Sequence, residues 1–267
     1  MDKAGREYWN NAWQGSAVPG PIDPVDPSPR NWVNRRFHRE FRRLFGESPK
    51  PGLRLLELGC AQSRWLPYFA REFGFSITGL DYSPIGCEMA RSVLAGSGVA
   101  GEIVCADFFA PPDVLRGAFD VVVSFGVAEH FDDTAACIRA FASFLKPGGL
   151  LFTNIPNMCG LVGSLQRLLN RPVYDIHQIL DRAALRSAHE AAGLEVISCE
   201  YFIFNNFGVC SLNGLRSDGV SWFIKKSLTG ALGRISMLAG FIEERTRDLR
   251  PGRFASANVN CIARRPA

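Results

Sequence analysis

Residues 54–63 read RLLELGCAQS and residues 76–82 read SITGLDY, and these two stretches decide the fold. Each is a short apolar run that ends in a glycine turn or a carboxylate, which is typical of a buried strand reaching the edge of a sheet. In an open α/β sheet, ligands bind beyond the carboxyl ends of the strands, where a carboxylate on the second strand can accept the hydroxyls of a ribose. Glu57 beside the first turn would repel a pyrophosphate but suits a ligand that carries a cation. The two stretches therefore predict a site for a nucleoside with a cationic group, near Glu57 and Asp81.

Outward from these stretches, apolar runs alternate with amphipathic helical stretches, which is the pattern of a parallel sheet with crossover helices. Strands are expected over 54–58, 76–80, 102–105, 119–125, 150–155, 194–204 and 256–263, and helices over 63–73, 85–95, 134–145 and 181–192. Asp181 is expected to cap the last helix and Gly193 to end it, and Lys146-Pro147-Gly148-Gly149 is expected to form a tight turn. The predicted fold class is α/β, a Rossmann-like doubly wound and mostly parallel sheet with an antiparallel last strand.

One domain with an insertion is expected, because 267 residues suffice for a single α/β core. It divides into an N-terminal lid and amphipathic helix (1–50), a cofactor-binding core (51–204), a helical insertion on the acceptor side (205–255) and a closing strand (256–267).

The amino-acid composition limits the classes of partner and the cellular compartment that we expect for the chain. A net charge of +4 is too small to indicate nucleic acid, and eight cysteines without a CxxC pair indicate neither a metal site nor a disulfide framework. Free thiols suit a reducing compartment, and no apolar stretch has the form of a signal peptide or a membrane span. A soluble cytoplasmic protein with a small-molecule substrate is expected, without nucleic acid or stable membrane insertion, and a homodimer stays open.

The segment before the sheet carries three large rings, Tyr8, Trp9 and Trp13, ahead of a proline-rich loop at 19–29. The next stretch, 31–45, has an apolar helical face and many arginines. A docked helix with a solvated basic face is the main expectation, and contact with a membrane or a nucleic acid is the alternative. The rings are expected either to close over a cofactor or to serve as ordinary core residues.

Five motifs in order give the chain a family resemblance: ELGCA (57–61), GLDYS (79–83), ADF (106–108), FDVVVSFGVAEHF (119–131) and LKPGGLL (145–151). Through them the chain resembles the class I S-adenosyl-L-methionine-dependent methyltransferases over roughly residues 53–204. The resemblance implies S-adenosyl-L-methionine as cofactor and no metal. In the glycine-rich turn of the family, Ala61 and Ser63 stand at two glycine places, where a positive φ would cost about 1–2 kcal/mol.

The resemblance also assigns cofactor-binding roles. Glu57 and Gly59 belong to the turn that holds the methionine and ribose, with Cys60 and Ala61 beside them, and Asp81 with Tyr82 follows the second strand. Asp107 and Phe108 would hold the adenine, and Phe125 would line the sulfonium side. Tyr8 and Trp13 resemble the aromatic lids that some methyltransferases fold over the cofactor.

Catalysis of methyl transfer depends largely on placing the acceptor behind the methyl carbon, and a hydroxyl or ammonium acceptor also needs a base. His130 is the first candidate for that base, with Glu129 beside it, although the pair also suits a role in ordering the loop. His177 and Tyr174, expected in a loop on the acceptor side, are candidates for binding or deprotonating the acceptor.

The insertion is expected to contain a helix whose apolar face covers an acceptor pocket. That face comprises Ile224, Leu228, Leu232, Ile235, Leu238 and Ile242, with Lys225, Lys226, Arg234 and Glu244 on the outer side. The alternatives are a helix that packs on the sheet or on a second subunit and, less favoured because the basic residues are few and the apolar face is short, a helix on a membrane surface. The expected activity is methyl transfer to an O or N atom of a small molecule. A regulatory or scaffold protein that binds the cofactor without turnover and, more remotely, a NAD-dependent oxidoreductase are the alternatives.

Overall fold

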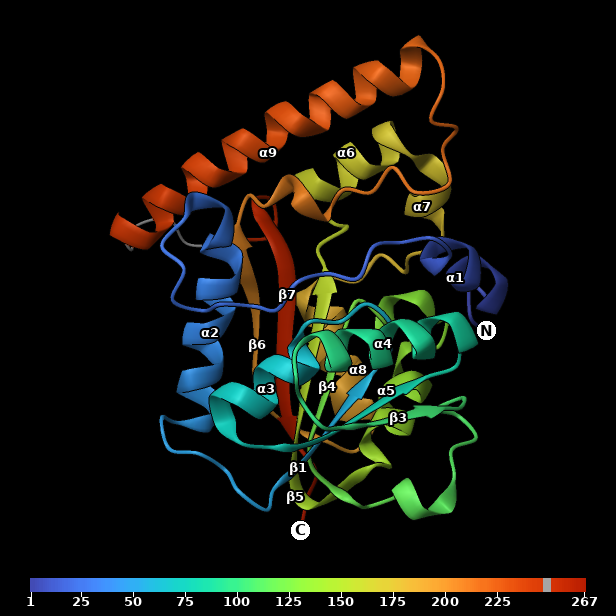
Figure 1. The fold of residues 1–267 in the computed structure, drawn as a ribbon, viewed down its shortest axis with the longest axis vertical. Helices are drawn as coiled ribbons and strands as arrows, with labels where there is room; N and C mark the ends of the chain where they lie inside the picture. The colour runs from blue at the N-terminus through green and yellow to red at the C-terminus, as the bar shows by residue number, and fades with distance from the viewer. Residues whose placement is uncertain (247–250) are drawn as a thin grey trace.

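The computed structural model describes residues 1–246 and 251–267, so that 247–250, part of the expected insertion, lie outside the described residues. Seven strands form one sheet in the order β3-β2-β1-β4-β5-β7-β6. The first five are parallel to their neighbours, and β7 is antiparallel to both β5 and β6 (Figure 1). The predicted α/β class, the mostly parallel sheet and the antiparallel last strand are confirmed.

The strands begin and end close to the predicted residues. They are β1 (Arg54–Leu58), β2 (Ser76–Asp81), β3 (Glu102–Cys105), β4 (Phe119–Phe125), β5 (Leu145–Pro156), β6 (Glu195–Phe204) and β7 (Ser256–Arg264). One prediction is wrong: the stretch from Lys146 to Gly149 is part of β5 and not a separate turn. The register shifts there, from Phe119 opposite Leu145 to Val121 opposite Leu150, so the extra residues are accommodated as an irregularity within the strand pairing.

Helices cover both faces of the sheet (Figure 1). One face carries α2 (Trp32–Phe45), α3 (Trp65–Phe73) and α4 (Pro84–Gly96), and the other carries α5 (Thr134–Ala142) and α8 (Arg182–Ala191). The predicted cap of α8 is confirmed, because the Asp181 side chain accepts a hydrogen bond from the Ala184 amide at 2.9 Å. Gly193 follows the helix with a φ of 83°, as expected of a residue that ends it.

Two helices lie where only a loop was expected. After β5 the chain forms α6 (Leu161–Leu169) and α7 (Arg171–Asp175), so Tyr174 is helical and the expectation of a loop is wrong. Asn170, between the two helices, is buried and donates through its side-chain amide to the carbonyl of Asn213 at 2.8 Å. The break between two short helices made this segment read as irregular in the sequence.

The N-terminal segment forms α1 (Arg6–Trp13) and then a long loop that ends in the short helix η1 (Pro29–Asn31). Helix α1 is held against α4 by the Ser83 hydroxyl, which donates to Asn10 Oδ1 at 2.6 Å. Farther along, α2 buries Phe37, Phe41 and Phe45 in an aromatic core, so the docked helix is confirmed.

The basic face of α2 is not simply solvated. Helix α9 (Val220–Thr246) crosses α2, and Arg35 forms a bidentate pair with Glu244 at 2.9 and 2.7 Å. Arg39 shares the same carboxylate at 3.3 Å, and Arg36 pairs with the buried Glu243 at 3.2 Å. The expectation that Glu244 faces outward is therefore wrong, because it neutralises arginines of α2.

The apolar residues of α9 contradict the expected pocket cover. Of the predicted face only Leu232 packs against the core, and the other five are exposed: Ile224, Leu228, Ile235, Leu238 and Ile242. The helix is instead held through a few small or charged residues. Ser236 Oγ accepts a hydrogen bond from the Phe207 amide, and Gly240 lies against Trp32. No helix in the described part of the chain is both long enough and apolar enough to cross a membrane.

The contact at Gly240 generates a test of how α9 is attached. A Cβ built on Gly240 would lie 2.2 Å from the Trp32 ring, whereas Gly230 in the same helix has nothing within 4 Å. Gly240→Ala should lower the free energy of unfolding by about 1–3 kcal/mol, the usual cost of overpacking. The matched control Gly230→Ala should raise it by up to about 1 kcal/mol, since alanine favours the helix. Equal changes in urea-unfolding midpoints for the two variants would contradict this packing.

Candidate active site

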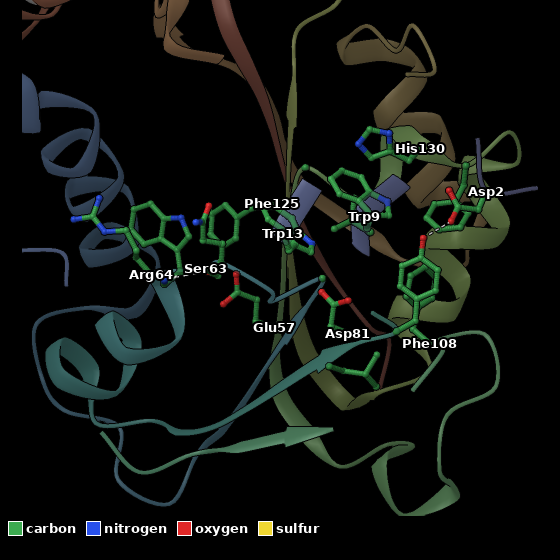
Figure 2. A pocket seen from close by; sticks show the side chains of 18 of the residues that line it. Asp2, Trp9, Trp13, Glu57, Ser63, Arg64, Asp81, Phe108, Phe125 and His130 are labelled. Atoms are coloured by element: carbon green, nitrogen blue, oxygen red, sulfur yellow. Dashed lines mark hydrogen bonds between the residues drawn. The ribbon is translucent and has the colours of Figure 1, made fainter. Parts of the chain in front are cut away.

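A cavity of about 400 Å³ lies at the carboxyl ends of β1, β2 and β4 (Figure 2). Its walls include eight of the predicted site residues: Trp13, Glu57, Gly59, Asp81, Tyr82, Phe108, Phe125 and His130. Such a volume falls in the range of small-molecule pockets. The parallel strands thus bring residues that are far apart in the sequence to one place, as the pattern of strand ends predicts.

The turn after β1 forms one wall of this cavity. Gly59 has a φ of 71°, and its amide donates to the Leu80 carbonyl at 2.8 Å, which ties the turn to β2. A Cβ there would lie 2.5 Å from Val127 Cγ2. Among the described residues other than glycine, only Ile203 and Asn205 have a positive φ, so Ala61 and Ser63 carry no such strain. The departure from the family's glycines is accommodated without that cost.

Glu57 is fully buried at the end of β1, and its carboxylate points into the cavity (Figure 2). Burial raises its pKa to about 8, against the hydrogen bonds from Ser63 and the Leu66 amide that lower it. One oxygen, Oε2, is buried without a hydrogen-bond partner. A desolvated carboxylate with a free oxygen fits a cationic ligand group such as an ammonium.

Asp81 ends β2 on the same side of the cavity. Its two oxygens accept from the Ala61 amide at 3.1 Å and from the Ser83 amide at 2.9 Å, which fixes the carboxylate. Burial raises its pKa, and the backbone donors lower it. Each oxygen keeps a lone pair, so the group can still accept from two ligand hydroxyls.

Aromatic residues form the rest of the wall. Phe108 lies edge-to-face with Phe131 at 5.3 Å, and both line the cavity. Phe125 stacks on Trp65 at 5.2 Å on the other side. These rings give an apolar slot of the kind that holds a planar base. Asp107 is exposed beside this cavity, in an adjoining hollow that Phe108 and Tyr82 also line.

The N-terminal segment covers the cavity, but with a different pair of rings from the one predicted. Trp9 and Trp13 line it and stack on each other at 5.7 Å, whereas Tyr8 does not line it and only meets the edge of Trp9. Residues four apart share a helix face, so the spacing of the two tryptophans contained this information.

Side chains that sequence reasoning missed hold this cover in place. Gln62 donates to the Ala17 carbonyl at 2.8 Å, and Arg64 donates to the Gly20 and Pro21 carbonyls at 2.6 and 2.9 Å. Near the N-terminus, the Tyr82 hydroxyl donates to Asp2 Oδ2 at 2.6 Å. The further cavity residues not predicted are Ile22, Asn34, Ser63, Trp65, Leu80, Gly126, Val127 and Phe131. Ser63, Leu80, Gly126, Val127 and Phe131 lie within the quoted stretches and motifs, which could have pointed to them, whereas Ile22, Asn34 and Trp65 lie outside them.

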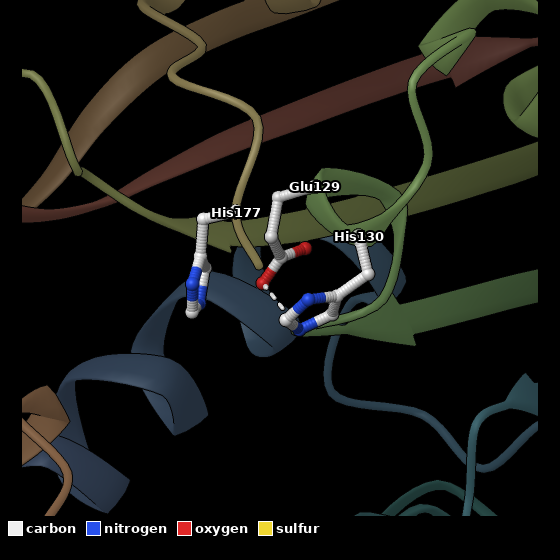
Figure 3. Close-up of side chains that lie close together, drawn as sticks. All are labelled: Glu129, His130 and His177. Carbon is white, nitrogen blue, oxygen red and sulfur yellow. Dashed lines mark ion pairs between the residues drawn. The ribbon is translucent and has the colours of Figure 1, made fainter. Parts of the chain in front are cut away.

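Glu129, His130 and His177 form a buried cluster next to the cavity (Figure 3). One ligand atom from each lies within 4.8 Å of the others, and His130 Nε2 is 3.9 Å from Glu129 Oε1. His130 Nδ1 contacts the Ile176 carbonyl at 3.0 Å, and His177 Nδ1 contacts the Val173 carbonyl at 2.6 Å. Since a carbonyl only accepts, each Nδ1 carries the proton and each Nε2 presents a lone pair.

The electrostatics of this cluster follow from burial. Burial raises the pKa of Glu129 to about 8, lowers that of His130 to about 4, and lowers that of His177. Glu129 Oε2 has no hydrogen-bond partner. Below about pH 8 the Glu129 carboxyl is therefore mostly protonated and can donate to an imidazole nitrogen, and above it the three groups are all acceptors that can take up a proton or hold a cation. His130 also lies edge-to-face with Trp9 at 5.1 Å, which places it at the cavity wall.

The remaining predicted residues lie behind or away from the cavity. Cys60 and Ala61 are buried and do not line it; the Cys60 sulfur faces Gly79, and Ala61 contributes its amide to Asp81. Tyr174, on α7, also does not line it. Direct cofactor contact by Cys60 or Ala61 side chains and direct acceptor contact by Tyr174 are thus not supported by this cavity. The binding and catalytic roles of the other residues remain predictions.

Comparison with known proteins relates the chain to one family. A family profile described as a methyltransferase domain matches residues 30–199. The ubiquinone biosynthesis O-methyltransferase of Methylobacterium nodulans is 32% identical over 187 residues, covering 67% of this chain and 73% of that protein. The enzyme of the same name from Thiobacillus denitrificans is 28% identical, covering 68% and 77%.

Solved structures share the fold. The geranyl diphosphate C-methyltransferase of Streptomyces coelicolor, in complex with Mg²⁺, geranyl diphosphate and S-adenosyl-L-homocysteine, aligns with a TM-score of 0.59 at 15% identity, over 97% of this chain and 96% of that one. An S-adenosylmethionine-dependent methyltransferase from Archaeoglobus fulgidus aligns with a TM-score of 0.54 at 18% identity, over 88% and 94%.

The geometry at Asp81 predicts how the expected cofactor binds. Asp81→Ala should weaken S-adenosylmethionine and S-adenosylhomocysteine by about ten- to a hundredfold, because two charge-assisted hydrogen bonds are worth roughly 1.5–3 kcal/mol. Calorimetric titration measures both affinities. Asp113→Ala, whose carboxylate is exposed in the short helix η2 (Asp113–Leu115), is the control and should bind normally. Unchanged affinity in the Asp81 variant would remove this residue from the site.

The burial of Glu57 predicts a pH dependence of binding. In the free protein the carboxyl is mostly protonated below its pKa of about 8, while an ammonium pairs only with the carboxylate. Cofactor binding must then release a proton, and affinity should rise from about pH 6 to about pH 8. Calorimetry in buffers of different ionisation enthalpy counts that proton. Glu57→Gln should abolish the release, whereas Glu88→Gln, exposed on α4, should retain it. Proton release that persists in the Glu57 variant would assign it to another group.

Proposed function

We propose that this chain, which belongs to the class I S-adenosyl-L-methionine-dependent methyltransferases, transfers the methyl group to a hydroxyl oxygen of a small organic acceptor. Membership rests on the family profile over residues 30–199 and on the 32% identity to a curated relative. The cofactor is S-adenosyl-L-methionine. Two of its curated relatives are O-methyltransferases of ubiquinone biosynthesis by name, which favours oxygen over nitrogen as the acceptor atom.

The observation that carries the proposal is the pairing of two carboxylates with different surroundings in one cavity. Glu57 has a buried oxygen without a partner, and it would receive the ammonium of the cofactor. Asp81, fixed by two amides, would accept the ribose hydroxyls. The apolar slot at Phe108 and Phe131 would take the adenine. These three groups match the cationic, polyhydroxyl and planar parts of one molecule.

S-adenosyl-L-methionine supplies an electrophilic methyl group on a sulfonium. What the protein adds is the position of the acceptor and the removal of its proton. The cluster of Glu129, His130 and His177 offers lone pairs next to the cavity, with both imidazoles neutral because burial lowers their pKa. We assign the acceptor proton to His130, which lines the cavity, and the support of that proton to Glu129 and His177 behind it.

The cover formed by α1 would keep water from the reacting groups. Trp9 and Trp13 lie over the cavity, and the Lys3 ammonium donates to the His177 carbonyl at 2.9 Å. The Lys3 amide also donates to the His130 carbonyl at 2.8 Å, so the cover and the cluster are tied together. Exclusion of water strengthens electrostatic interactions inside the site.

The cysteines support a proposal for the cellular compartment. All eight cysteines are free, and Cys199 and Cys261 face each other across β6 and β7 without a bond. Such a pair would be exposed to oxidation outside a reducing compartment. We therefore propose a cytoplasmic location.

The test of the function is methyl transfer from labelled S-adenosylmethionine to a panel of phenols, catechols, alcohols and amines. His130→Gln should lower kcat on a hydroxyl acceptor by about 10²–10⁴-fold, the usual contribution of a positioned base, with cofactor affinity retained. His38→Gln is the control, because that histidine lies on α2 against the Tyr68 hydroxyl and does not line the cavity. Retained kcat in the His130 variant would exclude it as the base, and transfer only to amines would exclude the proposed acceptor class.

A further inference from the structure

The first half of α9 makes almost no contact with the rest of the described chain. The helix runs from Val220 to Thr246, yet its buried residues are only Ser236, Gly240 and Glu243, all in the second half. In Figure 1 the amino-terminal end of α9 rises away from the body, above α6 and α7. A helix that stands free of the core must gain its stability from another surface or from its own sequence.

That free half presents large apolar side chains to the outside. Val220 is 75% exposed, and Phe223 and Ile224 are each 62% exposed. The exposed apolar residues continue along the whole helix, as Leu228, Ile235, Leu238, Phe241 and Ile242. Most are three or four residues apart, so they form one apolar stripe about six turns long. Contiguous patches of this kind mark contact surfaces, whereas single exposed apolar residues do not.

The charged residues of α9 differ in their surroundings. Its two acidic residues, Glu243 and Glu244, turn inward to the arginines of α2. Of its basic residues, Lys226, Arg234 and Arg245 are exposed and Lys225 is partly buried. Just ahead of the helix, the exposed pair of Arg216 and Asp218 adds no net charge. Among the described residues of α9, the two carboxylates are thus neutralised by α2, which leaves positive charge on the exposed surface of the helix.

We propose that the outer face of α9 docks on an anionic lipid surface, with the helix lying in the interface. Apolar residues flanked by lysine and arginine are what an interfacial helix requires, and the helix lies on the membrane because it is not apolar enough to span it. The same stripe could pack against α9 of a second copy, but the basic residues of two copies would then bring like charges together. Anionic headgroups would instead neutralise the basic residues of α9, which favours a lipid surface over a second copy of the chain.

The location of α9 connects this surface to the site. The arrow of β5 points toward α6 and α9, so the helix lies beyond the carboxyl ends of the parallel strands, the same end of the sheet as the cavity (Figure 1). The family profile ends at residue 199, before the helix begins. Docking through α9 is therefore a property of this chain's insertion and does not depend on the proposed acceptor.

The experiment measures sedimentation of the full chain with two kinds of vesicle, phosphatidylcholine alone and phosphatidylcholine mixed with phosphatidylglycerol. Binding to the mixed vesicles, weakened by added salt, is expected. Lys225→Glu combined with Arg234→Glu should weaken it about fivefold or more for each residue, since a basic residue near an anionic surface contributes about 1 kcal/mol. Phe223→Ser combined with Ile224→Ser should also reduce it, with the melting temperature and cofactor affinity unchanged because both side chains are exposed.

Val114→Ser combined with Ile197→Ser is the matched control, because these apolar residues are 79% and 53% exposed on η2 and β6. This variant should bind the mixed vesicles like the original chain. Absence of binding to the mixed vesicles, or equal loss in the control, would overturn the proposal. So would a dimer in light scattering that the α9 variants dissociate, because a second copy would then cover this face.

Discussion

The close approach of the Gly59 turn to Val127 is the constraint on which the rest of the site depends. With a φ of 71° and space for no side chain, Gly59 lets β1 turn sharply while its amide holds the Leu80 carbonyl of β2. The carboxyl ends of β1, β2 and β4 therefore meet around one cavity. Glu57 and Asp81 enter it from neighbouring strands, and their burial follows from the same close packing. A wider turn would admit water and remove the desolvation that distinguishes Glu57.

The sheet could be predicted from the sequence nearly to the residue, because parallel strands buried on both faces appear as uninterrupted apolar runs. Strands β1 and β4 begin and end where the runs do, and so does the edge strand β3, although it is only partly buried. The carboxylates at the strand ends could be predicted for the same reason, since the edge of the sheet is set by the strand ends themselves. The stretch from Lys146 to Gly149 could not, because its residues favour a turn, yet they are accommodated inside β5 as an irregularity between the pairs Phe119–Leu145 and Val121–Leu150.

The cover and the insertion could be predicted only as helices. Which face of α1 meets the cavity depends on ties such as Tyr82 to Asp2, and these join residues eighty apart that no local pattern connects. The same holds for α9, whose apolar spacing suggested burial. Its orientation is decided by Glu243 and Glu244, because the arginines of α2 attract them and Trp32 accepts only a glycine at position 240. Charge pairing there outweighs the burial of one apolar stripe, which stays outside.

The cluster of Glu129, His130 and His177 behind the cavity is ordered by hydrogen bonds to backbone carbonyls. His130 and His177 each donate the Nδ1 proton to a backbone carbonyl. The Nε2 atoms of both imidazoles are therefore hydrogen-bond acceptors. With Glu129 ionised, three electron-rich atoms would face one another, and burial, which removes water from the carboxylate, raises the pKa of that carboxyl to about 8. One added proton relieves the repulsion. The cluster therefore carries a proton on Glu129 near neutral pH, and the form that can take a proton from an acceptor hydroxyl at the cavity wall grows as the pH rises through about 8.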